Sequence, residues 1–158
     1  MNLIVTTPHR FVHGPDGKVA SDSGPAYPFW QRYLDVFDTV KVVGRLSPQK
    51  STASRTVEGP GVSFLAIPYY HGPWQYVRQA PRIQAALNAA IGPEDAVILR
   101  VPSQISSGLV RKVWREGRPY GVEVVGDPHD VFAPGAVKHP LRPFFRWWFP
   151  QRLRRQCA

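Results

Sequence analysis

The stretch that decides the fold is AVILRVPSQISSGLVRKVWREGRPYGVEVV, residues 96–125. It begins with a short apolar run (96–101), continues with apolar residues at helical spacing (104–116), passes Gly117 and ends in a second apolar run (120–125). A short, continuous apolar run is typical of a strand buried on both faces, and apolar residues three and four apart are typical of a helix packed on one side. The stretch therefore predicts a strand, a crossover helix and a second, parallel strand.

Similar apolar runs occur earlier in the chain, at residues 3–7, 39–45 and 62–67. Helical spacing follows two of them, from near Ala26 and over residues 75–91, where Pro81 either kinks the helix or marks its first turn. Alternating strands and helices at this spacing predict an α/β fold with a doubly wound parallel sheet and flanking helices. With right-handed crossovers we expect the order 3-2-1-4-5, counting the five strands along the chain.

Each predicted strand is followed by a segment rich in polar residues. Ligands of open α/β sheets bind beyond the carboxyl ends of the strands, so these segments are the candidate functional regions. We expect long loops over residues 8–25 and 46–61, the second of them a mobile surface loop.

Length and composition narrow the class of protein. The 158 residues fit one domain with a core of its own, and the single cysteine, Cys157, excludes a disulfide framework and a cysteine-rich zinc site. Residues 1–7 lack the features of a secretory leader, and no segment has the roughly 18 apolar residues of a membrane span. We therefore expect a cytoplasmic protein. A last helix over 140–156 has no strand after it, so we also expect a single N-terminal domain (1–158) cut from something longer.

The formal net charge of +9 is unevenly distributed, because no acidic residue follows Asp130. The segment 131–158 mixes arginines with aromatic residues, as a basic, aromatic helix does. Such a helix either packs its rings on the sheet or lies on an anionic membrane, with Trp at the headgroup level and Arg paired to phosphates. We do not expect nucleic acid as a partner. The membrane alternative assigns contacts to Arg146, Trp147, Trp148, Arg152, Arg154 and Arg155.

The first candidate binding residues follow the first strand. Segment 8–25 places His9, His13, Ser23 and Gly24 before a predicted helix N-terminus. Backbone N–H groups beside a positive helix end suit a phosphate or the hydroxyl groups of a sugar. Neither a GxGxxG fingerprint nor a P-loop is present, so no dinucleotide site is predicted. The alternative interpretation is a surface loop without a ligand.

A second group, Gly126-Asp127-Pro128-His129-Asp130, follows the fifth strand. Carboxylates flanking a histidine orient it as a general base or as the hydrogen-bond partner of a substrate hydroxyl. No fourth ligand lies at a defined spacing, so we expect no metal. The alternative is a turn in which Asp127 caps the following segment.

Two further segments add candidates. Arg100 ends the fourth strand and Ser103 opens the next helix, where an arginine either holds a phosphate or carboxylate or pairs with an acid after the fifth strand, Asp127 or Asp130. Tyr70 and His71 follow the third strand and offer flat, polar-edged surfaces that stack on sugars or bases, although such residues also occur in cores.

Two classes of hydrolase have little support in the sequence. No GxSxG elbow precedes a helix, and Cys157 has no nearby histidine, so nucleophilic hydrolysis has no candidate residues. Glycosidases need two placed carboxylates in an apolar cleft, and eleven acidic residues leave few candidates.

The order of elements, the glycine-containing loop after the first strand, R-V-P-S at 100–103 and V-V-G-D-P-H-D-V-F at 124–132 resemble the N-terminal half of a family 4 glycosyltransferase with the GT-B fold. In that family two Rossmann-like domains face each other across a cleft. The N-terminal domain binds the acceptor, and the C-terminal domain binds most of the nucleotide-sugar. The resemblance implies retention of the anomeric configuration and no metal or other cofactor.

The resemblance also implies roles for individual residues. His129 would contact the donor sugar and Asp130 would orient it, as the catalytic pair. Segment 8–24 would line the acceptor side, with Ser23 and Gly24 nearest the reacting sugar. The donor domain is absent from these residues, so we expect the chain alone to be inactive.

The sequence thus predicts the acceptor-binding half of a retaining glycosyltransferase, which transfers a sugar from a nucleotide-sugar to a glycan or lipid-linked acceptor in the cytoplasm or at the inner membrane face. The first alternative is a stand-alone basic α/β module that binds an anionic membrane or polymer without catalysis. The second is a small flavodoxin-like nucleotide or flavin binder.

Overall fold

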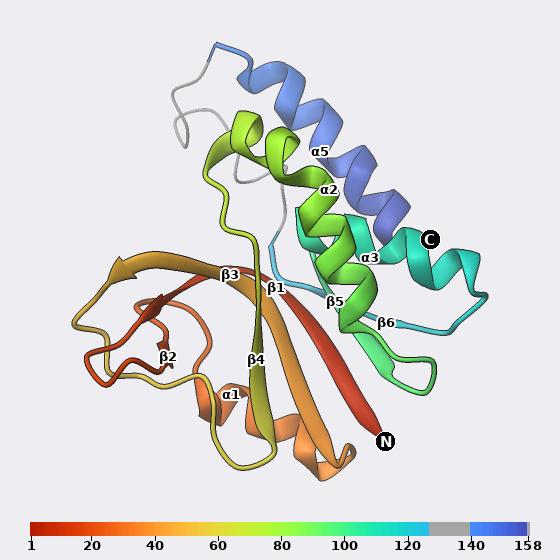
Figure 1. Ribbon diagram of the computed structural model, residues 1–158. Helices are drawn as coiled ribbons and strands as arrows, with labels where there is room; N and C mark the ends of the chain where they lie inside the picture. The colour runs from red at the N-terminus through yellow and green to blue at the C-terminus, as the bar shows by residue number, and fades with distance from the viewer. Residues whose placement is uncertain (127–139, 158) are drawn as a thin grey trace.

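The structure, a computed structural model, describes residues 1–126 and 140–157 (Figure 1). Its centre is a six-stranded sheet, in which five strands run parallel in the order β4-β3-β1-β5-β6. These five are the predicted strands, so the predicted order 3-2-1-4-5 is confirmed. The strands are β1 (Asn2–His13), β2 (Val19–Ala20), β3 (Thr39–Lys50), β4 (Val62–Ile67), β5 (Ala96–Val101) and β6 (Gly121–Val124).

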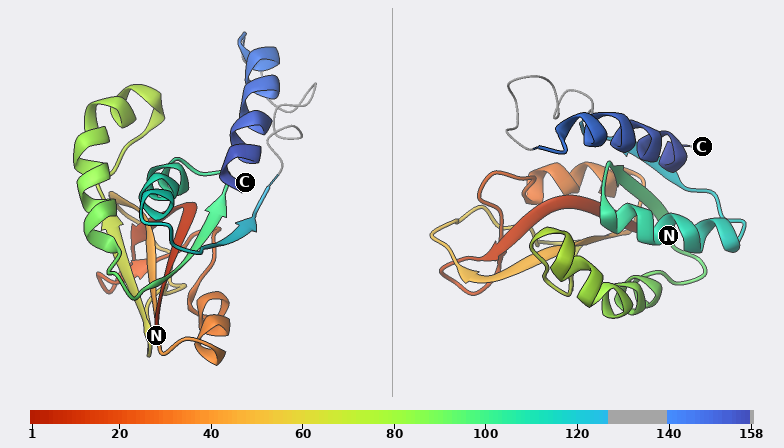
Figure 2. Two further views of the ribbon diagram at one scale, coloured as in Figure 1. Left: turned by 90° about the vertical axis from the view of Figure 1, so that its right-hand side faces the viewer. Right: turned by 90° about the horizontal axis from the view of Figure 1, so that it is seen from above.

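Helices cover both faces of the sheet, as a doubly wound fold requires. On one face lie α2 (Gly72–Ala90) and α3 (Gln104–Arg115), and on the other lie the short α1 (Tyr27–Gln31) and the 3-10 turn η1 (Arg32–Asp35). The last helix, α5 (Arg142–Cys157), packs beside α3, which therefore lies between α2 and α5 (Figure 2). None of the described helices is both long and apolar enough to cross a membrane.

Two apolar clusters form the core, one on each face of the sheet. Side chains of a strand alternate between the faces, and in β1 Leu3 and Val5 join the cluster around Trp30 of α1, whereas Ile4 joins the cluster under α2 and α3. All three are at most 1% exposed. Burial on both faces explains why these strands are continuous apolar runs in the sequence.

The polar segments after the first two strands differ from the prediction. The predicted loops 8–25 and 46–61 are partly strand, because β1 continues to His13 and β3 to Lys50, with a bulge between Thr6 and Arg10. The β2 strand then pairs antiparallel with the end of β1. Phe11 of the extended β1 and Val57, whose N–H donates to the carbonyl of Val19 in β2, are fully buried, so the two polar segments carry a part of the core that their composition conceals.

Glycines with positive φ angles lie at the start of α2 and shortly after α3. The α2 helix begins at Gly72, which has φ +73°, three residues before the predicted start, and Pro81 lies inside it. Gly117 after α3 has φ +61°, the left-handed conformation that ends a helix, as predicted. The predicted final helix over 140–156 is confirmed as α5.

Candidate functional site

His9, Ser21 and Gly24 lie close together on the α1 face of the sheet, at the bulge of β1 and near Arg100 at the carboxyl end of β5. A β-carbon added to Gly24 would lie 3.1 Å from Cγ of His9 and 3.1 Å from Oγ of Ser21. His9 sits at the bulge of β1, and its backbone N–H donates to Oγ1 of Thr7 at 3.3 Å. Glycine at position 24 therefore allows the segment before α1 to close onto His9. Of the predicted first-loop residues, His9 and Gly24 are brought together.

Arg100 of β5 lies on the same face and is only 6% exposed. Its Nε donates to Oε2 of Glu123 at 2.7 Å, and its guanidinium carbon lies 4.7 Å from the ring centre of Phe29 and 5.4 Å from that of Trp30. Its Nη1 is buried without a hydrogen-bond partner among the described residues. The guanidinium is therefore held by one carboxylate and two aromatic rings, and it retains donor capacity.

Glu123 is shared between two arginines. Arg32 of η1 donates to its Oε1, and Tyr33 donates from its hydroxyl to Oε2 at 3.1 Å. Burial alone would raise the pKa of Glu123, but the hydrogen bond from Arg32 and the charge of Arg100 outweigh burial and lower it. Burial raises the pKa of Tyr33. Two guanidinium groups thus face one carboxylate, and the cluster has one positive charge in excess.

The pKa of the His9 side chain is lowered from its ordinary value, first by burial and then by the positive charge of Arg100. The imidazole is consequently neutral at pH 7, with one ring nitrogen able to accept a proton and the other able to donate a hydrogen bond. A neutral histidine beside a cationic group suits contact with a hydroxyl near an anionic group.

Hydrogen bonds of side-chain hydroxyl groups connect β1, the carboxyl end of β5 and the first turn of α3. Ser106 donates to the carbonyl of Arg100 at 2.7 Å, and Thr6 Oγ1 lies 2.8 Å from Ser106 Oγ. Since the Ser106 proton goes to that carbonyl, Thr6 donates to Ser106 and accepts from the Arg100 N–H at 3.2 Å. Ser103 is the N-cap of α3, and its hydroxyl accepts from the N–H groups of Ile105 and Ser106.

Tyr70 and His71 belong to the other face of the sheet. Tyr70 is buried in the cluster under α2 and α3, with the Arg45 guanidinium 4.8 Å from its ring centre. Arg45 in turn donates to the carbonyl of Pro8 at 2.8 Å. His71 is the exposed residue before α2, and its backbone N–H donates to Gln75. The structure therefore does not bring this pair together with His9.

The remaining predicted residues lie elsewhere. His13 is at the far end of β1, with Nδ1 3.4 Å from the Gly17 carbonyl, and Ser23 is exposed. Asp127, His129 and Asp130 lie outside the described residues, so their roles stay predictions. Within residues 1–126 and 140–157, no group of three His, Cys, Asp or Glu side chains is placed to hold a metal ion.

The predicted membrane residues lie on α5. Trp147 is 63% exposed and Trp148 38%, Arg154 and Arg155 are exposed, and Arg146 is half-buried. The structure does not describe the side chain of Arg152. The alternative, in which the aromatic rings of this helix pack on the sheet, is therefore wrong for Trp147 and for Phe144, which is 50% exposed.

Arg100 does form an ion pair among the described residues, and its partner is Glu123 of the predicted fifth strand itself. Asp127 and Asp130, the partners proposed from the sequence, lie outside the described residues. Glu123, Arg32 and Tyr33 were all missed by the sequence analysis. The signal was present in the predicted strand order, because Arg100 and Glu123 lie directly opposite each other on the neighbouring strands β5 and β6. No such signal exists for Arg32 and Tyr33. They belong to a short 3-10 turn, and the predicted strand order does not say which strand that turn will contact.

Comparison with known proteins reveals one partial similarity that bears on function. The chain is 30% identical over 110 residues to Protein CapJ of Staphylococcus aureus. The matched segment covers 69% of this chain, but it spans only 28% of the length of CapJ. No protein-family profile matches the chain, and no solved structure gives a significant match.

Proposed function

We propose that this chain is the acceptor-binding half of a glycosyltransferase, which transfers a sugar from a nucleotide-sugar to a glycan or lipid-linked acceptor with retention of the anomeric configuration. The single observation that carries the proposal is the neutral His9, closed against Gly24 beside the cationic Arg100 at the carboxyl ends of the strands. This is the region in which doubly wound sheets bind their ligands. The resemblance of the chain to family 4 transferases supplies the reaction class.

In this proposal His9 forms a hydrogen bond with a hydroxyl group of the acceptor sugar. The excess positive charge of the Arg32, Arg100 and Glu123 cluster favours an acceptor or donor that brings a phosphate near that hydroxyl. Ser21, whose buried Oγ has no hydrogen-bond partner among the described residues, supplies a further donor next to Gly24. His129 and Asp130 are assigned to the donor sugar by the resemblance alone.

The nucleotide would be bound by a second domain, carried by a further part of the polypeptide or by a partner. The similar segment of CapJ makes up 28% of that protein, which leaves room for a second domain there. The proposal requires no metal and no cofactor besides the nucleotide-sugar, which is a substrate. It also predicts that the 158-residue chain alone binds acceptor without turnover.

The test is a transfer assay on the complete polypeptide from its own host, with radiolabelled nucleotide-sugars and the host's lipid extract as acceptor. We expect His9→Ala to lower kcat/KM by about 100-fold, the contribution of a well-placed acid–base or hydrogen-bonding group. Lys50→Ala, an exposed change at the far end of β3, is the matched control and should leave the rate unchanged.

Two results would overturn the proposal. One is the absence of sugar transfer from every nucleotide-sugar tested with the unmodified polypeptide. The other is normal transfer by His9→Ala. This result would show that His9 does not bind the acceptor, although the protein would still be a sugar transferase.

A further inference from the structure

The three helices α2, α3 and α5 carry basic residues and no acidic ones. Neither aspartate nor glutamate occurs within Gly72–Ala90, Gln104–Arg115 or Arg142–Cys157. From the sequence alone, a basic segment was predicted only for the last of the three. We use the name basic face for the arginines that these helices expose together, which are Arg78, Arg82, Arg111, Arg115, Arg154 and Arg155.

The α3 helix forms the ridge of the basic face, with a hollow on each flank. Towards α2, a hollow of about 360 Å³ is lined by Gln84, Asn88, Arg111, Lys112, Arg115 and the acidic Glu116. Towards α5, a hollow of about 720 Å³ lies between the two helices, and Arg111 contributes to both. The view along this side of the molecule shows α3 between α2 and α5 (Figure 2).

Large aromatic side chains are exposed on the same helices. Trp74 at the start of α2 is 82% exposed, Trp114 of α3 49%, and Phe144 and Trp147 of α5 50% and 63%. Trp114, Phe144, Trp147 and Trp148 line the larger hollow together with Arg111 and Arg155. Exposed aromatic residues in such a concentration mark a contact surface rather than an ordinary solvated one.

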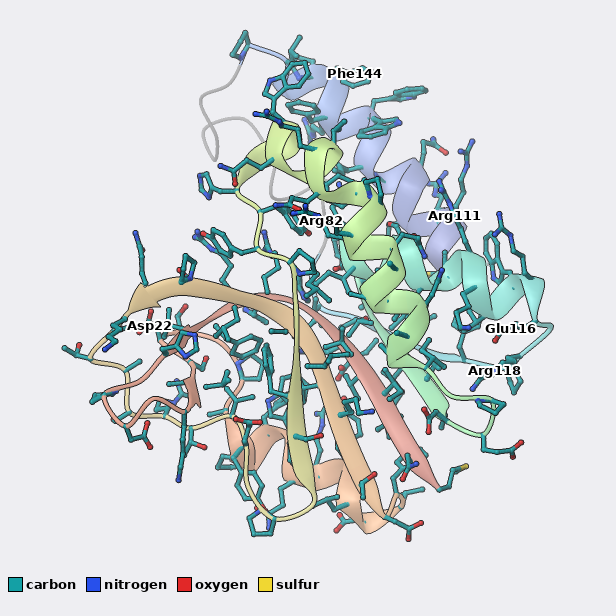
Figure 3. The ribbon with its side chains drawn as sticks, in the orientation of Figure 1. Asp22, Arg82, Arg111, Glu116, Arg118 and Phe144 are labelled. Atoms are coloured by element: carbon teal, nitrogen blue, oxygen red, sulfur yellow. The ribbon has the colours of Figure 1, made fainter. Side chains whose placement is uncertain are left out.

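Five of the described acidic residues lie in another part of the fold, whereas Glu94 and Asp95 lie in the connection between α2 and β5. Asp16, Asp22, Asp35, Asp38 and Glu58 all belong to the part of the chain that holds β2, α1 and η1. Figure 3 shows Asp22 on the side of the molecule away from Arg82, Arg111 and Phe144.

Among the residues that line the two hollows, the acidic one is Glu116, which follows α3. It is held by Lys112 at 2.8 Å and by Arg118 at 3.3 Å, so it is matched by cations of its own. The basic face therefore keeps an excess of positive charge.

We propose that the basic face binds the surface of an anionic phospholipid bilayer. Arginines pair with lipid phosphates, and Trp and Phe rings insert at the headgroup level, so the mixture of the two matches this partner in both charge and chemistry. A second copy of the chain is disfavoured, because the same faces would bring cations against cations. The inference does not depend on sugar transfer and is tested without it.

The experiment is flotation of the protein with vesicles of phosphatidylcholine alone and of equal parts phosphatidylcholine and phosphatidylglycerol. We expect binding to the anionic vesicles only, and weaker binding as salt rises. The triple variant Arg111→Glu, Arg115→Glu, Arg155→Glu should lower the partition coefficient by at least about tenfold, since each basic residue near the surface contributes to binding.

The matched control is the triple variant Lys18→Glu, Lys50→Glu, Arg55→Glu, which makes the same charge change at exposed positions away from the basic face. It should retain most of the binding. An equal loss in both variants would overturn the proposal, because net charge rather than this face would then govern attraction.

A second measurement needs no charge variant. Vesicles with brominated acyl chains should quench the tryptophan fluorescence of the unmodified protein, and Trp147→Ala together with Trp114→Ala should remove most of that quenching. The proposal would be overturned if the protein neither floated with anionic vesicles nor showed quenching by them. Binding to a nucleic acid without binding to vesicles would also overturn it and would assign the face to that polymer.

Discussion

Arg100 and Glu123 lie opposite each other on the parallel strands β5 and β6, and Arg100 Nε donates to Glu123 Oε2 at 2.7 Å. The arginine is almost completely buried, whereas the side chain of Glu123 is 31% exposed and also receives Arg32. A single carboxylate therefore joins the edge strand β6 to both β5 and η1.

The first prediction concerns this carboxylate. Glu123→Gln removes the charge opposite a buried guanidinium, and we expect the free energy of unfolding to fall by about 2 kcal/mol in urea denaturation. Glu116→Gln, which breaks an exposed ion pair, should leave the urea midpoint unchanged. Equal effects of the two changes would contradict the structural role given to Glu123.

The second prediction concerns the hydroxyl group of Thr6, which connects β1 to Arg100 and Ser106 by hydrogen bonds. Thr6→Val removes the acceptor of the Arg100 N–H and the donor to Ser106, and it should lower the free energy of unfolding by about 1–3 kcal/mol. Thr6→Ser keeps the hydroxyl and loses one methyl group, which costs about 1 kcal/mol. Chemical denaturation of both variants should show that Thr6→Val is the less stable of the two. If Thr6 had a purely apolar role, Thr6→Ser would be the less stable.

The third prediction is a dependence of stability on pH. Because the pKa of His9 is lowered in the folded protein, the unfolded chain binds the proton first as the pH falls through about 6.5. The stability that His9 contributes is therefore complete above this value and is lost as the pH falls through the folded pKa.

The pKa of Glu123 is likewise lowered, from 4.5, so its contribution is lost only in more acidic solution. Urea denaturation at about pH 7.5 and about pH 5.5 separates the two groups. His9→Asn should show a smaller difference between these conditions than the unmodified protein. An unchanged difference would show that His9 is not buried as described.

The fourth prediction concerns the contact between α2 and α3. A β-carbon on Gly108 would lie 2.6 Å from Cδ1 of Leu87, so Gly108→Ala should destabilise the protein by about 1–3 kcal/mol despite its better helix propensity. Leu87→Ala alone leaves a cavity and also destabilises. In the double variant the two effects should partly cancel, and simple additivity of their unfolding free energies would argue against this close contact.

The strand order was predictable from the sequence, because helical spacing separates the five apolar runs at three of their four connections and leaves few right-handed topologies. The continuation of β1 was not, since Pro8-His9-Arg10 interrupts the apolar run and the pairing resumes through main-chain hydrogen bonds that any side chain permits. Phe11 and Val57 show the same limit, because Phe11 belongs to an apolar pair and Val57 stands alone, each within a polar segment, and both are fully buried in the fold.

The candidate site was predictable in part. His9, Gly24 and Arg100 follow strands in the sequence and meet at one end of the sheet, as that topology requires. Tyr70 and His71 also follow a strand, but they lie on the other face, and the sequence gives no sign of which face a residue beyond a strand end will take. The basic face was missed for a similar reason, because its cations come from three separate helices.

The central position of β1 has a consequence for how the chain folds. This strand is made first, yet its two neighbours come later, with Leu3 pairing to Val40 on one side and to Ala96 on the other. During synthesis one side of an apolar strand stays open until most of the polypeptide has left the ribosome. Nascent chains that stop before β5 should therefore be the species most prone to aggregate and most dependent on chaperones, and the long separation between paired strands should make folding slow.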